Sequence, residues 1–153
     1  MNFLETKIPP PLVALCTGTL MWFGADQTPP VALPPAWRLA IALTLIGIGL
    51  CCDLAGLILF LRRRTTINPL KPQASSALVC TGIYRRTRNP MYLGLLFILL
   101  GWAAYLSNLL SLLLVPLFVG YITRFQIVPE ERILADKFGA AFAAYRAQVR
   151  RWL

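Results

Sequence analysis

The stretch "WRLAIALTLIGIGLCCDLAGLILFL", residues 37–61, decides the fold class because it is long and apolar enough to cross a bilayer. A transmembrane helix needs about 20 predominantly apolar residues. The whole chain of 153 residues is 58% hydrophobic, with a mean hydropathy of +0.65. Soluble domains are typically ~45–50% apolar. The sequence therefore predicts an all-α integral membrane protein, with residues 1–153 forming one domain.

Three further apolar runs, at residues 12–25, 90–106 and 109–127, bring the expected number of transmembrane helices to about four. The first run is the shortest, and a proline-rich segment separates it from the second. The letters "YLSN" indicate a tight turn between the third and fourth runs, and Pro116 predicts a kink in the fourth.

The segment after the fourth run predicts an amphipathic helix. Its apolar residues recur every three or four positions, at Leu134, Phe138, Phe142, Tyr145, Val149 and Trp152. Such a helix lies on the membrane surface or folds back over the spans. Gly139 is expected to divide it.

The formal net charge of +9 is concentrated between and after the apolar runs. The loop at residues 62–89 has no acidic residue, and its cations are Arg62, Arg63, Arg64, Lys71, Arg85, Arg86 and Arg88. The positive-inside rule then predicts that this loop and both termini are cytoplasmic, as in a bacterial inner membrane. Topology and anionic membrane lipids explain the charge better than nucleic acid.

Histidine is missing from the sequence, and no C-x-x-C spacing occurs. The commonest general base and metal ligand is therefore lacking, and we expect no metal. The cysteines, Cys16, Cys51, Cys52 and Cys80, are expected to be buried or reduced thiols.

Two short motifs carry chemistry. In "RRTRNPMYLG", residues 85–94, Asn89 is a good N-cap and Pro90 fits the first helical position, so free N–H groups and nearby arginines suit an anion. Alternatively, the arginines only set topology. In "VPEERILADKFG", residues 128–139, Glu130 and Glu131 either stabilise the helix dipole or bind ribose hydroxyls or a cation.

The region from Leu78 to Leu153 resembles the isoprenylcysteine carboxyl methyltransferase and phospholipid methyltransferase superfamily. The matching text is "LVCTGIYRRTRNPMYLG" and, after a hairpin of two spans, "EERILADKFGAAFAAYRAQVRRWL". The resemblance implies an S-adenosylmethionine-dependent methyltransferase whose cytoplasmic cofactor site lies in residues 76–92 and 129–153. The implied cofactor-binding residues are Ser76, Leu78, Val79, Tyr84, Arg88, Asn89, Pro90, Tyr92, Glu130 and Glu131.

Two positions depart from the eukaryotic carboxyl methyltransferases. Asn89 stands where those enzymes have histidine, and Gln126 stands where they have an arginine implicated in substrate binding. A lipophilic acceptor is expected, and an isoprenoid carboxylate, a lipid amine and a thiol all remain open. Glu130, Tyr92 and Asp53 are the catalytic candidates.

Asp53 lies inside the second apolar run, and an ionisable residue in a span is a functional candidate. It is expected to pair with an arginine such as Arg124, or to contact a polar substrate head group. Nearby, Gly47, Gly49 and Gly56 are expected to permit close helix packing.

A methyltransferase is the leading interpretation. One alternative is a small four-span, proton-coupled transporter that uses Asp53, and another is a scaffold without activity. Cofactor binding separates them, because the methyltransferase alone requires it.

Overall fold

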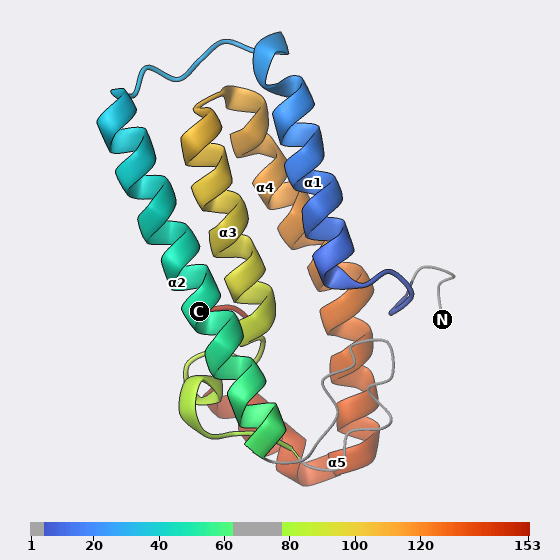
Figure 1. Cartoon of the computed structure of the whole chain (residues 1–153). Helices are drawn as coiled ribbons and strands as arrows, with labels where there is room; N and C mark the ends of the chain where they lie inside the picture. Colours follow the sequence, from blue (N-terminus) through green and yellow to red (C-terminus); the bar gives the residue numbers. More distant parts are fainter. Residues whose placement is uncertain (1–4, 63–77) are drawn as a thin grey trace.

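A computed structural model describes residues 5–62 and 78–153, and these residues form helices joined by short connections (Figure 1). The main helices are α1 (Pro10–Gly24), α2 (Pro35–Arg62), α3 (Pro90–Leu106), α4 (Leu109–Ile122) and α5 (Val128–Gln148). Short helical turns are η1 (Ala25–Gln27), η3 (Gly82–Arg85) and the π-helical η4 (Thr123–Ile127). The all-α prediction is confirmed. Ser76, Arg63, Arg64 and Lys71 lie outside the described residues.

The helix boundaries follow proline. Helices α1, α2 and α3 begin at Pro10, Pro35 and Pro90, where a missing N–H is no loss and the fixed φ suits a first turn. The first two helices therefore start two residues before the apolar runs at 12–25 and 37–61. The third coincides with its run, and the fourth run divides into α4 and η4.

Helix α3 lies at the centre of the bundle, against α1, α2 and α4 (Figure 1). Its buried residues Leu99 and Ala103 share a core with Met21, Phe118 and Ile122. By length and composition, α2 and the continuous helix Leu109–Gln148 could each cross a membrane, and α3 is a shorter apolar helix.

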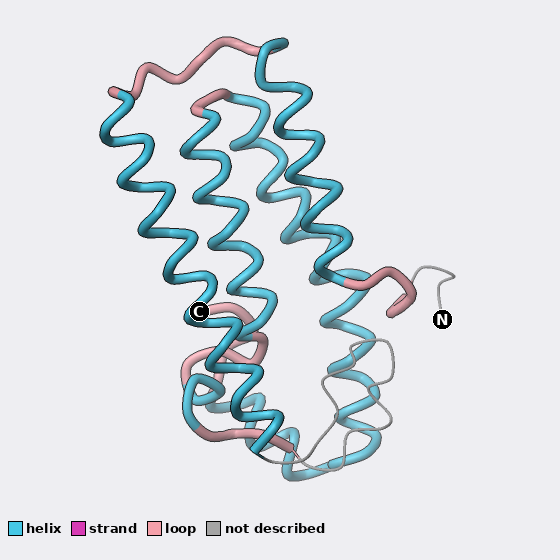
Figure 2. The backbone as a smooth tube through the Cα atoms, in the orientation of Figure 1, coloured by secondary structure: helices cyan, strands magenta, loops and turns pink. Residues whose placement is uncertain are grey.

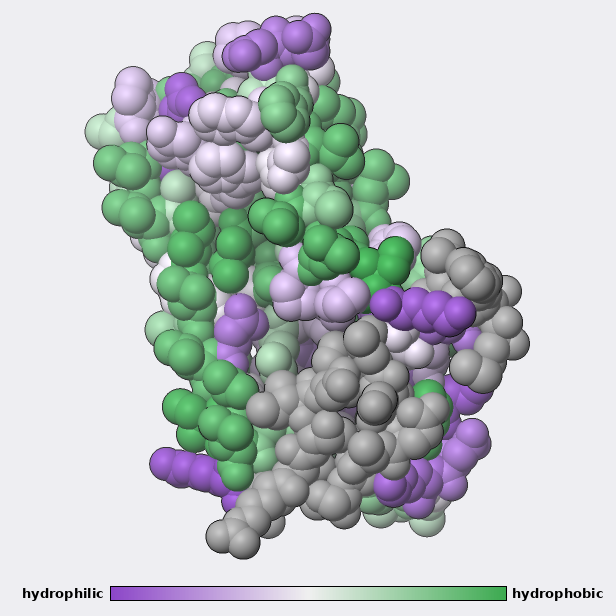
Figure 3. Space-filling model, turned by 45° about the vertical axis from the view of Figure 1, so that its right-hand side comes forward, coloured by the Kyte–Doolittle hydropathy of each residue, from purple (hydrophilic) through white to green (hydrophobic). Residues whose placement is uncertain are grey.

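The outer faces of the bundle are apolar. Phe23, Leu43 and Leu117 are 72%, 62% and 67% exposed. In Figure 3, hydrophobic side chains cover much of the visible flank between polar groups toward both ends. Such a surface suits lipid rather than water.

The cysteines differ from the expectation of burial. All four are free thiols, but Cys16 and Cys51 are exposed and Cys52 and Cys80 are partly exposed. Cys16 lies in α1, and Cys51 and Cys52 lie in α2, where lipid can surround a thiol as readily as protein does. Cys80 lies before η3 and packs against the core that contains Tyr84 and Phe142.

Helix α5 continues η4 and then bends. Gly139 has a φ of 49°, a left-handed conformation that favours glycine, and the helix changes direction there, so the expected division is confirmed. After the bend the chain returns beneath the bundle, and its end lies beside the start of α3 (Figure 2). The tail therefore folds back over the spans.

Close contact between α2 and α3 depends on glycine. A Cβ on Gly49 would lie 2.6 Å from the Gly94 carbonyl oxygen, and one on Gly56 would lie 2.9 Å from Met91 Cγ. A Cβ on Gly47 would meet nothing within 4 Å. The packing expectation therefore holds for Gly49 and Gly56 and is wrong for Gly47, which faces away from α3.

We expect Gly49→Ala to lower the free energy of unfolding by about 1–3 kcal/mol, because backbone rather than a flexible side chain opposes the added methyl. Gly47→Ala is the matched control and should leave stability unchanged or slightly higher, because its methyl enters open space. Thermal unfolding of both detergent-purified variants, followed by tryptophan fluorescence, checks this. Equal unfolding temperatures for the two variants would contradict the described α2–α3 contact.

Candidate functional site

A buried ion-pair cluster lies where α3 and α5 begin. Glu131 accepts hydrogen bonds from Arg88 Nη2 and Arg151 Nη2, each at 2.7 Å. Its side chain is 10% exposed and that of Arg88 is 9% exposed. Burial alone would raise the pKa of Glu131, but hydrogen bonds and charge from Arg151 and Arg88 outweigh it and hold the pKa below its ordinary value. Glu131 is therefore ionised, and both of its carboxylate oxygens are bound by arginine.

The start of α3 also binds the end of the chain. Arg88 Nη1 donates to the Val149 carbonyl at 2.5 Å, and Asn89 Nδ2 donates to the Arg151 carbonyl at 2.9 Å. Asn89 is the N-cap residue of α3, as expected, but its side chain makes no capping hydrogen bond. Arg85 and Arg86 are exposed and do not line the cavity described next.

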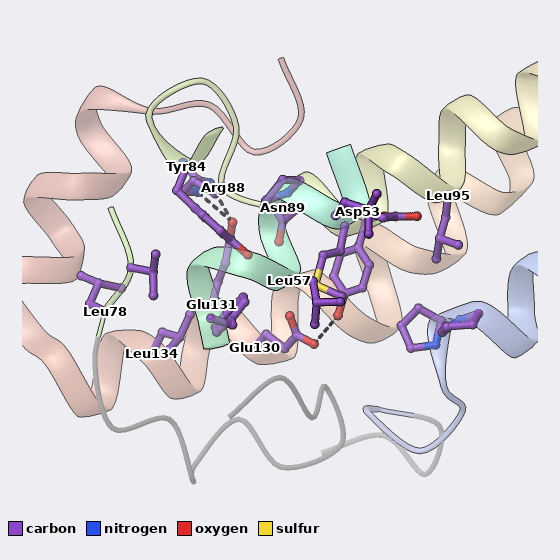
Figure 4. Close-up of a pocket in the computed structure, with 18 of the residues that line it drawn as sticks. Asp53, Leu57, Leu78, Tyr84, Arg88, Asn89, Leu95, Glu130, Glu131 and Leu134 are labelled. Carbon is purple, nitrogen blue, oxygen red and sulfur yellow. Dashed lines mark hydrogen bonds and ion pairs between the residues drawn. The ribbon is translucent and has the colours of Figure 1, made fainter. Parts of the chain in front are cut away.

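A cavity of about 560 Å³ lies beside this cluster, between α2, α3, α5 and the start of α1 (Figure 4). Every described residue predicted to bind the cofactor lines it, and so does Asp53. These residues are Leu78, Val79, Tyr84, Arg88, Asn89, Pro90, Tyr92, Glu130 and Glu131. Ser76 lies outside the described residues. The fold thus brings both sequence motifs to one cavity.

Glu130 differs from its neighbour Glu131. Tyr92 donates a 2.5 Å hydrogen bond to Glu130 Oε1, and no other described donor reaches this carboxyl group. Burial raises the pKa of Glu130 to about 8; the Tyr92 hydrogen bond lowers it and the Glu131 charge raises it. Glu130 is therefore mostly protonated at neutral pH and has hydrogen-bonding capacity left for a ligand.

One end of the cavity is aromatic, and its residues were missing from the predicted set. Phe142 and Tyr145 line it from the returning part of α5, beside Tyr84. The Tyr145 hydroxyl donates to the Tyr84 carbonyl at 2.8 Å, and Phe60 meets Tyr84 edge to face at 5.6 Å between centroids. The apolar periodicity of the tail contained the signal, because this face covers the cavity.

Asp53 does not form the expected pair with Arg124. Arg124 lies 3.8 Å from Glu5, and Asp53 Oδ1 is buried without a hydrogen-bond partner. The prediction was wrong because Arg124 is exposed, next to the buried Glu5 of the N-terminal segment, whereas Asp53 faces α3.

The N-terminal segment supplies a wall that sequence patterns did not predict. Pro9, Pro10 and Pro11 line the cavity. The segment is held because Thr6 N–H donates to the Phe125 carbonyl at 2.9 Å and Gln126 Nε2 donates to the Ile8 carbonyl at 2.5 Å. Gln126 therefore has a structural contact with the N-terminal segment.

No three histidine, cysteine or acidic side chains of the described residues are grouped to hold a metal ion. The cavity instead combines a carboxyl group free to bind a ligand, an aromatic end and long apolar walls. Such a lining suits an amphipathic organic molecule.

Comparison with known proteins places these residues in a family. The family model described as "Phospholipid methyltransferase" matches residues 37–141, more than half of the chain. An uncharacterized protein of Haemophilus influenzae (strain ATCC 51907 / DSM 11121 / KW20 / Rd) is 49% identical over 63 residues, which are 41% of this chain and all of that protein. No solved structure matches. The chain therefore belongs to the phospholipid methyltransferase family, and it is a membrane protein of that family.

Proposed function

We propose that this protein is an integral membrane methyltransferase that uses S-adenosylmethionine to methylate a lipophilic acceptor. The supporting observation is the meeting of two motifs, about 40 residues apart, on the wall of one cavity. The proposed orientation places the α5 end and both termini in the cytoplasm, where the soluble cofactor is available.

The residues present fit the cofactor. A volume of about 560 Å³ falls within the ~300–1,000 Å³ range of small-molecule sites. Tyr84, Phe142 and Tyr145 offer apolar faces for adenine. Glu130 offers a carboxyl group that can accept hydrogen bonds from ribose hydroxyls, and Asn89 lines the same cavity (Figure 4). When bound, S-adenosylmethionine supplies a methyl group on a cationic sulfur, which is an activated leaving group.

The proposed methyl transfer depends on the positioning of cofactor and acceptor more than on acid–base chemistry. The leaving group is already activated, so the chain contributes an oriented cofactor site and walls that exclude water. Leu57, Leu95 and Leu134 supply such walls. Tyr92 and Glu130 share a proton next to the site and would hold or accept one when the acceptor loses it.

The proposed acceptor enters from the bilayer. Leu50 and Leu54 of α2 line the cavity, yet they are 50% and 56% exposed on the outer surface. The wall at α2 therefore extends to a face that lipid would cover. Membrane lipids and a lipophilic acceptor are the partners that this arrangement fits.

Calorimetric titration of the detergent-purified protein with S-adenosylhomocysteine tests the proposal. We expect binding with a dissociation constant of about micromolar order, equivalent to about −8 kcal/mol. Glu130→Gln should weaken binding about tenfold or more, because a charge-assisted acceptor is lost. Asp136→Asn removes an exposed carboxylate from the same helix and should bind like the wild type. If folded wild-type protein does not bind S-adenosylhomocysteine, the proposal is refuted and the transporter alternative is favoured.

The raised pKa of Glu130 predicts a pH dependence. If the ligand binds the ionised carboxylate, Glu130 must release its proton on binding at any pH below about 8. The affinity for S-adenosylmethionine should therefore rise between pH 6.5 and 8.5 and level off above. The limiting slope is about tenfold per pH unit. Titrations in two buffers of different ionisation enthalpy should show proton release below pH 8. If affinity changes with pH in the same way in the wild type and in the weakly binding Glu130→Gln variant, the ligand does not contact the Glu130 carboxylate.

A further inference from the structure

We propose that the η3 turn and the end of the chain together bind the phosphate group of an anionic phospholipid at the membrane surface. The exposed side chains that form this surface, named the arginine rim, are Arg85, Arg86, Arg146 and Arg150. These four described residues do not line the cavity. The inference goes beyond the proposed methyl transfer and does not depend on it.

Two segments that lie about 60 residues apart in the sequence build the arginine rim. The main-chain N–H of Arg88 donates to the Arg150 carbonyl at 3.0 Å, and Arg88 Nη1 donates to the Arg146 carbonyl at 3.2 Å. Arg85 ends η3, and Arg86 is the C-cap residue of this turn, just before Arg88. The fold therefore gathers four exposed arginines beside the start of α3.

The positive charge of the arginine rim is not neutralised within the described chain. The nearby carboxylate of Glu131 is already bound by Arg88 and Arg151. All six acidic residues of the chain belong to the described part, and within that part none of the rim arginines forms an ion pair. Like charges gathered in this way raise the local electrostatic potential and attract anions.

A topology signal does not account for this arrangement. The positive-inside rule counts cations close to the membrane-spanning segments along the sequence, and it places no demand on where they lie after folding. Arg85 and Arg86 satisfy the rule without Arg146 and Arg150 beside them. Because placing like charges together is unfavourable, their meeting in the fold indicates a surface that binds an anion.

The arginine rim lies where the apolar part of the bundle ends. The η3 turn packs against the last turns of α2 (Figure 1), and a Cβ on Gly82 would lie 2.7 Å from Leu59 Cδ1. At the chain end, Trp152 packs against the apolar core of the bundle, and Leu153 is 64% exposed. Tryptophan and exposed apolar side chains next to arginines are typical of the membrane–water interface. The phosphate groups of a bilayer would therefore lie at the level of the arginine rim.

An anionic phospholipid matches this surface better than a soluble anion does. A guanidinium group can donate two parallel hydrogen bonds to a phosphate. Leu54, Ile58 and Leu61 are 56%, 46% and 59% exposed, so acyl chains can lie along α2 next to the η3 turn. Free phosphate lacks this apolar contact, and phosphatidylcholine carries a cation that cancels the charge of its phosphate. Each arginine near an anionic membrane surface contributes about fivefold to binding, which corresponds to about 1 kcal/mol.

Native mass spectrometry of the full-length protein tests this proposal. The protein is released from nanodiscs that contain equal amounts of phosphatidylglycerol and phosphatidylcholine with the same acyl chains, and the lipids retained on each protein are counted. We expect phosphatidylglycerol to be retained over phosphatidylcholine by about fivefold or more. Arg85→Gln with Arg86→Gln, and Arg146→Gln with Arg150→Gln, should each lower this preference by about threefold or more, because both segments hold the phosphate.

The matched control variant is Arg124→Gln with Arg132→Gln. It removes the same charge from two exposed arginines beside Glu5 and should retain the preference. Equal retention of both lipids by the wild type, or an equal loss in all three double variants, would overturn the proposal, because net charge alone would explain the second result. A loss in only one of the two rim variants would refute a surface shared by both segments, and displacement of phosphatidylglycerol by millimolar inorganic phosphate would refute the lipid as its ligand. If tryptophan fluorescence shows that one rim variant does not fold, the other rim variant and the control decide.

Discussion

The enclosure of Glu131 between two guanidinium groups is the interaction on which the site depends. A carboxylate with so little exposure would be costly to bury alone, and removing one partner of such a buried pair typically costs about 3–5 kcal/mol. Arg88 precedes α3, Glu131 begins α5 and Arg151 lies near the chain end, so one cluster fixes three segments. The returning tail then brings Phe142 and Tyr145 over the cavity. The cluster holds that aromatic wall beside α3 together with the hydrogen bond from Tyr145 to the Tyr84 carbonyl and the hydrogen bond from Asn89 to the chain end.

The same cluster explains why adjacent glutamates behave differently. Consecutive residues on a helix point about 100° apart, so Glu131 reaches the arginines while Glu130 reaches Tyr92. One carboxyl group is held ionised by cations, and the other has its pKa raised by burial. Environments that separate the pKa values of neighbouring groups are typical of functional sites. Glu131 supports the structure, which leaves Glu130 available for a ligand.

Sequence patterns predicted the helices and the residues that line one cavity better than the contacts between those residues. Apolar runs and proline starts gave α3 at its observed bounds, and the two motifs named residues that do share a cavity. These patterns did not predict which side chains contact one another. Whether Arg88 meets a ligand or Glu131, and whether Gly47 or Gly49 faces α3, depends on helix rotation and on distant segments that local spacing does not determine.

The cavity walls differ in how firmly they are held. This difference fits a soluble cofactor that enters from water and a lipophilic acceptor that enters from the bilayer. The polar wall is fixed by buried ion pairs and by hydrogen bonds to the chain end. Helix α2 packs on α3 rather than on α1, and the leucines on its cavity edge remain exposed toward lipid. On the proposed function, a lipophilic acceptor could therefore enter past α2 without disturbing the Glu131 cluster. The N-terminal wall of prolines, held chiefly through Gln126 and the Glu5 contacts, would then limit how far the acceptor chain extends.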